Sequence, residues 1–133
     1  MRVAINEIGV TEIHGIRNNP RIITYHTSTG NFKDDETAWC SSFANWTVNQ
    51  VDVDGTGSAL ARSWLSWGHG LNSYKYGAIT VVNKKGTGNY HVGFAAGSSK
   101  NYITILGGNQ GRPGQVKYSN FNFSNYNIYF RMP

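Results

Sequence analysis

The sequence has 133 residues and a mass of 14.7 kDa, enough for one domain whose core needs no disulfide or metal. Hydrophobic residues make up 39% of the sequence and include four Trp, which excludes a disordered chain. The sequence has no run of about 18 apolar residues, so no membrane span is predicted. The net charge of +5 indicates either a basic surface that only keeps the protein in solution or an anionic partner, a nucleic acid or a polyanionic cell-surface polymer. Because the basic residues are scattered, we expect no nucleic-acid binding.

Helical patterns dominate the first half of the chain. Residues 2–13 are predicted to form a short helix interrupted at Gly9, and 14–36 a loop with one short extended piece at 22–25. A helix of about 13 residues is predicted to begin just before Cys40, after the capping residue types Asp34, Asp35 and Thr37. A turn at 52–58 then precedes a second core helix at 61–68.

After Gly77 the pattern changes to that of strands. Apolar, β-branched and aromatic residues predict strands at 78–82, 90–96, 102–106 and 127–132, with turns at 97–101 and 111–114. Because helices come first and an antiparallel meander follows, the sequence predicts a single α+β domain over residues 1–133.

Cys40 is the first candidate for chemistry. It is the only cysteine, so an internal disulfide is excluded. In the first turn of its predicted helix, free backbone N–H groups and the positive end of the helix dipole would stabilise a thiolate. A cysteine that serves packing alone could lie anywhere on the buried face, so this position favours a nucleophile over a small buried hydrophobe.

A thiolate nucleophile needs a base, and His91 is the candidate. It lies inside a predicted apolar strand, where burying a titratable ring costs free energy, so a functional role would explain its position there. The other histidines lie in loop stretches and are predicted to be solvated or structural: His14, His26 and His69. If the hairpin turn centres near 98–100, antiparallel partners sum to about 198 and His91 faces residues 107–109. The amide of Asn109 could then hold the second ring nitrogen and fix its tautomer, as in a Cys-His-Asn arrangement.

Other chemistries have less support. A catalytic zinc ion needs three ligands, and no two histidines are close in the sequence. The segment from Asp52 imitates a calcium loop, but Ser63 stands where that loop needs a bidentate Glu. A glycosidase needs two carboxylates, and no Asp or Glu follows Asp54. We expect neither a metal nor a cofactor.

Four motifs occur in order and together span nearly the whole chain: residues 38–46 (AWCSSFANW), 55–65, His91–Phe94 and Leu106–Gln110. They resemble the papain-like NlpC and CHAP (cysteine, histidine-dependent amidohydrolase/peptidase) superfamily, above all its small bacterial and phage cell-wall hydrolases. The resemblance implies a papain-like fold with N-terminal helices packed on an antiparallel β-meander. It also implies a peptidoglycan-cleaving thiol hydrolase with Cys40 as nucleophile, His91 as base and Asn109 as orienting residue. Gly107 stands where many members have Glu, which makes Gln110 a second candidate for the orienting role.

We therefore expect a single catalytic domain that cleaves the peptide stem or cross-link of peptidoglycan, as an endolysin-like endopeptidase. The alternatives are an N-acetylmuramoyl-L-alanine amidase with the same residues and a non-catalytic wall-binding module. Trp39 and Gln110, next to Cys40 and Asn109, are predicted to contact the substrate. We expect a monomer made in the cytoplasm without a secretory signal, which other machinery would carry to the periplasm or cell wall.

Overall fold

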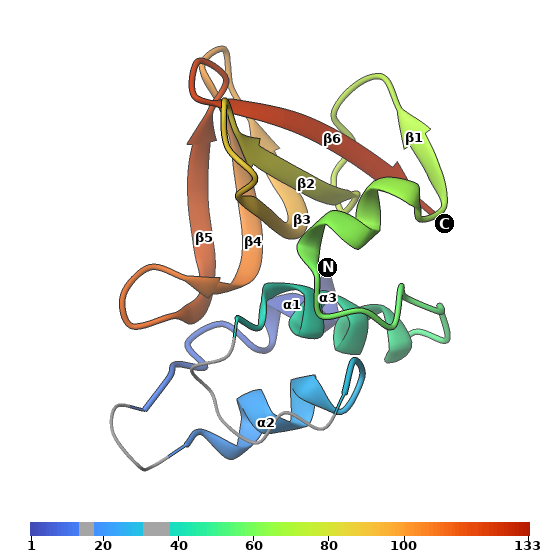
Figure 1. Ribbon diagram of the computed structural model, residues 1–133, viewed down its shortest axis with the longest axis vertical. Coiled ribbons are helices and arrows are strands. Elements are labelled where there is room, and N and C mark those ends of the chain that lie inside the picture. The colour runs from blue at the N-terminus through green and yellow to red at the C-terminus, as the bar shows by residue number, and fades with distance from the viewer. Residues whose placement is uncertain (14–17, 31–37) are drawn as a thin grey trace.

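The protein is described by a computed structural model that covers residues 1–13, 18–30 and 38–133. Its main element is a six-stranded antiparallel sheet with the strand order β1-β6-β2-β3-β4-β5. The strands are β1 (His69–Leu71), β2 (Ile79–Lys84), β3 (Tyr90–Ser98), β4 (Tyr102–Gln110), β5 (Gln115–Asn122) and β6 (Tyr126–Met132). Figure 1 shows the sheet above the α-helices, which gather at one end of the molecule.

The described helices are short. They are α1 (Arg2–Ile5), α2 (Pro20–His26), α3 (Cys40–Asn49) and a 3₁₀ helix, η1 (Ala61–Ser66). Helix α3 packs against β3 and β4 on one side and α2 on the other, so it lies between α2 and the sheet (Figure 1). No helix among the described residues has the length and apolar character needed to cross a bilayer.

The predicted papain-like α+β fold, with N-terminal helices packed on an antiparallel meander, is wrong. Of the described residues 35% lie in strands and 22% in helices, so the molecule is mainly a six-stranded sheet with few short helices. The helix predicted over 2–13 is reduced to four residues, and Gly9 beyond it adopts a φ of 99°. The second core helix is a six-residue 3₁₀ helix.

Two strands that were not predicted, β1 and β5, form the two edges of the sheet. Strand β1 has only three residues, and all three pair with β6, from His69 opposite Met132 to Leu71 opposite Phe130. Strand β5 carries Ser or Asn at three positions, residue types that are neutral or depleted in strands. These polar side chains are tolerated because a sheet edge is partly solvated. The four predicted strands are confirmed, with β3 and β4 extending further than expected.

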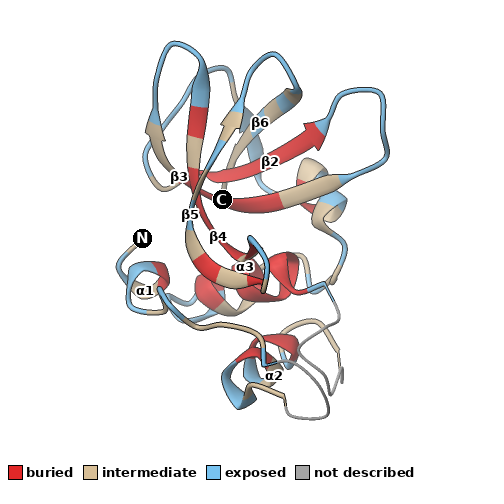
Figure 2. Ribbon diagram, turned by 90° about the vertical axis from the view of Figure 1, so that its left-hand side faces the viewer, coloured by how far each residue is buried: buried red, intermediate tan, exposed pale blue. Residues whose placement is uncertain are grey.

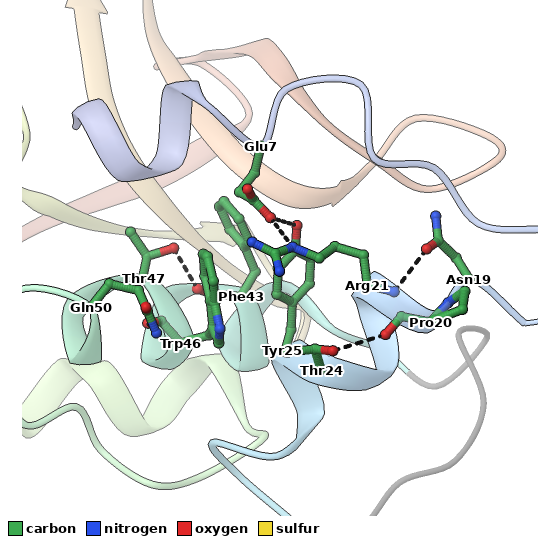
Figure 3. Close-up of polar contacts among 10 residues, drawn as sticks. All are labelled: Glu7, Asn19, Pro20, Arg21, Thr24, Tyr25, Phe43, Trp46, Thr47 and Gln50. Carbon is green, nitrogen blue, oxygen red and sulfur yellow. Dashed lines mark hydrogen bonds and ion pairs between the residues drawn. The ribbon is translucent and has the colours of Figure 1, made fainter.

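Helix α2 replaces the extended piece predicted at 22–25. Asn19 caps it by accepting a hydrogen bond from the Arg21 N–H at 2.9 Å, and Pro20 occupies the first helical position, where its missing N–H costs nothing. These start signals outweigh the strand preference of the β-branched residues that follow. Figure 3 shows the result: Glu7, beyond α1, receives hydrogen bonds from Arg21 and from the Tyr25 hydroxyl.

The core surrounds α3, where nearly every residue is buried (Figure 2). The Phe43 ring packs edge-on against Tyr25 of α2 at 5.0 Å and against Phe94 of β3 at 6.4 Å, so it joins both layers. Full burial of such a side chain contributes about 1.5–3 kcal/mol. The predicted start of this helix, just before Cys40, is confirmed. The predicted capping residues Asp34, Asp35 and Thr37 lie outside the described residues, as does His14.

Candidate active site

Cys40 is the first residue of α3. The first hydrogen bond of the helix runs from the Phe43 N–H to the Trp39 carbonyl at 2.9 Å, so the N–H groups of residues 40–42 precede the helical ladder. Their donors and the helix dipole give the Cys40 sulfur a positive environment. The residue is 7% exposed, which leaves the thiol close to the surface while its surroundings remain largely dry.

The paired ladder of strands β3 and β4 ends before it reaches His91. Their ladder runs from Ser98 paired with Ile103 to Phe94 paired with Leu106, and no pairing between β3 and β4 continues beyond that point toward the start of β3. The backbone N–H groups of Val92 and Ser41 lie near the Cys40 sulfur and lower the pKa of the thiol. Val92 belongs to the strand that carries His91, so β3 contributes both a backbone donor and the imidazole to the surroundings of the thiol.

The thiol of Cys40 and the ring of His91 lie close enough for each group to shift the pKa of the other. Burial raises the pKa of Cys40, but the charge and hydrogen bond of His91 and the two backbone donors outweigh it, so the pKa lies below its ordinary value. Burial lowers the pKa of His91, but the thiolate charge and the hydrogen bonds to Cys40 and Gln110 outweigh it, so this pKa lies above its ordinary value. Both shifts favour a thiolate–imidazolium pair.

Gln110 fixes the orientation of the His91 ring. Its Oε1 lies 2.8 Å from Nε2 of His91, while its own Nε2 donates to the carbonyls of Ile105 and Lys117. Because those carbonyls can only accept, the amide group must present its oxygen to His91, and His91 must donate through Nε2. The remaining ring nitrogen, Nδ1, is then the one available to Cys40.

The structure places Asn109 differently from the sequence analysis. Strand β4 has an irregularity between Gly107 and Gln110 in its pairing with β5, and Asn109 adopts a left-handed backbone with φ 55°. In a regular strand, residues 107 and 109 would share a face. The irregularity instead brings Gln110 to the Gly107 face, where a Cβ on Gly107 would lie 2.7 Å from Gln110 Oε1 and 3.4 Å from His91 Nε2. The Asn109 side chain points toward Gly114, so the geometry favours Gln110 for the orienting role.

Trp39, predicted to contact the substrate, is fully buried and supports the site from behind. Its Nε1 donates to Glu12 at 2.9 Å, and its ring lies against Gly108 of β4. A Cβ on Gly108 would lie 2.6 Å from the Trp39 ring and 2.8 Å from Phe43 Cβ, so only glycine lets α3 approach β4 this closely. Gln110 is 4% exposed and binds His91. Trp39 has no exposed surface, whereas Gln110 lines a surface pocket together with His91 and Asn109.

A buried polar network holds the chain segment 53–60 beside the start of α3. Ser41 Oγ donates to the Ser58 carbonyl at 2.7 Å and accepts from Trp64 Nε1 at 2.9 Å. Asn45, one turn later, accepts from the Gly57 N–H and donates to the Ser58 carbonyl. The sequence analysis missed these residues, although polar side chains at 41 and 45 on a helix expected to be buried were an available signal.

Two of the other histidines, His26 and His69, are described, and neither contacts this pair. His26 is fully buried in α2 with Nδ1 2.9 Å from Ser42 Oγ, and His69 is exposed on β1. Within the described residues, no three His, Cys, Asp or Glu side chains come close enough to hold a metal ion. No protein-family model matches this chain, and no curated protein matches it either.

Proposed function

We propose that this protein is a thiol hydrolase that cleaves an amide bond in the peptide part of peptidoglycan, with Cys40 as nucleophile and His91 as general base and acid. The observation that carries the proposal is the Cys40–His91 pair at the start of α3, with the pKa of each group shifted toward the charged form. Such shifts in opposite directions in a neighbouring pair are typical of an activated nucleophile.

The residues suggest a sequence of steps. The Cys40 thiolate attacks the amide carbonyl, and the resulting oxyanion is stabilised by the N–H groups at the start of α3. The His91 imidazolium then protonates the leaving amine, which breaks the C–N bond and leaves a thioester on Cys40. Neutral His91 next takes a proton from water, whose oxygen attacks the thioester and releases the acid. Throughout, Gln110 keeps the ring in position through Nε2.

Two features support an amide substrate in the cell wall. The part of the chain after Asp54 contains no carboxylate, so no acid there could protonate a glycosidic oxygen, whereas a thiolate attacks planar carbonyls well. The net charge of +5 suits an anionic wall polymer. The resemblance to the NlpC and CHAP hydrolases favours the stem or cross-link over the bond between sugar and peptide, and favours action in the periplasm or wall.

The test is digestion of purified peptidoglycan, with mass spectrometry of the released fragments and assays of new amines and new reducing sugar ends. We expect new amines from the peptide part and no new reducing ends. Freed lactyl groups would agree with the thiol mechanism but would identify the enzyme as an amidase instead of an endopeptidase. New reducing ends without amines, or no wall cleavage at all, would refute the proposal.

Cys40→Ser is the matched control, since it keeps the shape of the side chain and removes the low-pKa thiol. It should be as inactive as Cys40→Ala, because a hydroxyl is hardly ionised near neutral pH. Cleavage by Cys40→Ser at the wild-type rate would exclude Cys40 as the nucleophile.

A further inference from the structure

An arginine lies over the ring of the tyrosine that precedes His91 in the chain. The Arg62 guanidinium carbon, in η1, is 5.7 Å from the centre of the Tyr90 ring at the start of β3. Arg62 is exposed and Tyr90 half-buried. A guanidinium held against a ring face still has N–H donors along its edge, in the fork geometry that binds a carboxylate.

Both residues are tied to the neighbourhood of Cys40. Tyr90 precedes His91 and packs against the core cluster that contains Cys40 and Trp64. Trp64 lies two residues after Arg62 and donates through Nε1 to Ser41 Oγ, next to Cys40. Helix η1 also packs directly on β3. The position of the guanidinium is therefore set by the same residues that surround the thiol.

Among the residues that the structure describes, no carboxylate pairs with Arg62. Across residues 1–13, 18–30 and 38–133, the ion pair formed is that of Arg21 with Glu7. Helix η1 and strands β1–β6 contain no Asp or Glu, because the sequence has none after Asp54. Within the described part of the chain, the Arg62 guanidinium is thus available to an external anion.

We propose that Arg62, stacked on Tyr90, binds a carboxylate of the substrate beside the scissile bond. This rests on the proposed function and narrows it: the preferred substrate is a wall peptide with a free carboxylate within reach of Arg62, and amidation of that carboxylate weakens binding. A bidentate contact to the planar guanidinium would orient the peptide across Cys40.

The first test requires no turnover. The rate of Cys40 alkylation is measured with iodoacetate, which is anionic, and with iodoacetamide, its neutral analogue, at neutral pH and low salt. In Arg62→Gln the ratio of the two rates should fall about threefold, because the cation that attracts the anionic reagent is gone. Arg2→Gln is the matched control, since Arg2 lies near Val48 and Val51, at the opposite end of α3 from Cys40. Its ratio should equal that of the wild type.

The second test compares wall peptides with free and with amidated carboxylates. Arg62→Gln should raise KM for the free-carboxylate substrate about tenfold, leave kcat within about twofold, and abolish the preference over the amidated form. If the wild type cleaves neither substrate while the reagent ratio still falls in Arg62→Gln, the proposed function fails and the anion site stands. An unchanged reagent ratio, or an unchanged substrate preference in an active enzyme, would overturn the role of Arg62.

Discussion

Gln110→Ala should lower both the free energy of unfolding and the reactivity of Cys40. The amide is 4% exposed and forms hydrogen bonds with His91 and with the carbonyls of Ile105 and Lys117. Each of these three bonds contributes about 1 kcal/mol net, and truncation also leaves a cavity, so we expect a loss of about 2–4 kcal/mol. Because the His91 ring loses the contact that orients it, alkylation of Cys40 at neutral pH should slow about tenfold.

Both effects can be measured on one preparation, with urea unfolding followed by Trp fluorescence and iodoacetamide labelling followed by mass. Asn109→Gly is the matched control, because it deletes the neighbouring amide and keeps a left-handed backbone that glycine adopts readily. It should leave labelling within about twofold of the wild type. If Asn109→Gly slows labelling strongly and Gln110→Ala does not, the assignment of the orienting role to Gln110 is wrong.

Three further outcomes are expected. Cys40→Ala should abolish wall cleavage and change the free energy of unfolding by about 1 kcal/mol, since one small side chain is lost; residual activity within tenfold of wild type would exclude the thiol mechanism. The Cys40→Ala/His91→Ala double variant should be no less active than either single variant, because the two groups act as a unit; rates that multiply would argue for independent roles. Gly108→Ala should lower the free energy of unfolding by about 1–3 kcal/mol, measured by urea titration, because the new Cβ meets the rings packed behind Cys40; an unchanged midpoint would contradict that packing.

The sequence was most informative where pattern and chemistry agree. The helix start at Cys40 follows from apolar spacings of three and four, and His91 lies in a strand whose apolar residues are plain. The contact between the two residues could be expected only because a thiolate nucleophile needs a base, since no local pattern in either segment indicates that they meet. The structure brings them together by packing α3 against β3 and β4.

Helix α2 shows where local preference misleads. Its residues Ile22, Ile23 and Thr24 favour a strand, but the Asn19 cap and Pro20 start a helix, and burial of Ile22 and Tyr25 on one face stabilises it. The share of strand in the fold was underestimated for a related reason. Short or Asn-rich edge strands carry weak signals, and their pairing depends on partners distant in the sequence.

The choice between Asn109 and Gln110 depended on one irregularity in a strand. Ladder counting brings residues near 109 opposite His91, which is close to correct, but side chains alternate only in a regular strand. The left-handed backbone at Asn109 changes which residue faces His91. No local sequence pattern in Gly107–Gln110 distinguishes these two outcomes, because the irregularity is set by pairing with β5.

The most direct test of the central claim is the pH dependence of Cys40 alkylation by iodoacetamide, in the wild type and in His91→Ala. The rate reports the thiolate fraction, so its midpoint gives the pKa of Cys40. In the wild type the midpoint should lie below the ordinary value near 9, because the His91 charge favours the thiolate. In His91→Ala it should move to higher pH, since burial then acts with less opposition. A wild-type midpoint at or above pH 9 that does not move in His91→Ala would contradict an activated Cys40–His91 pair.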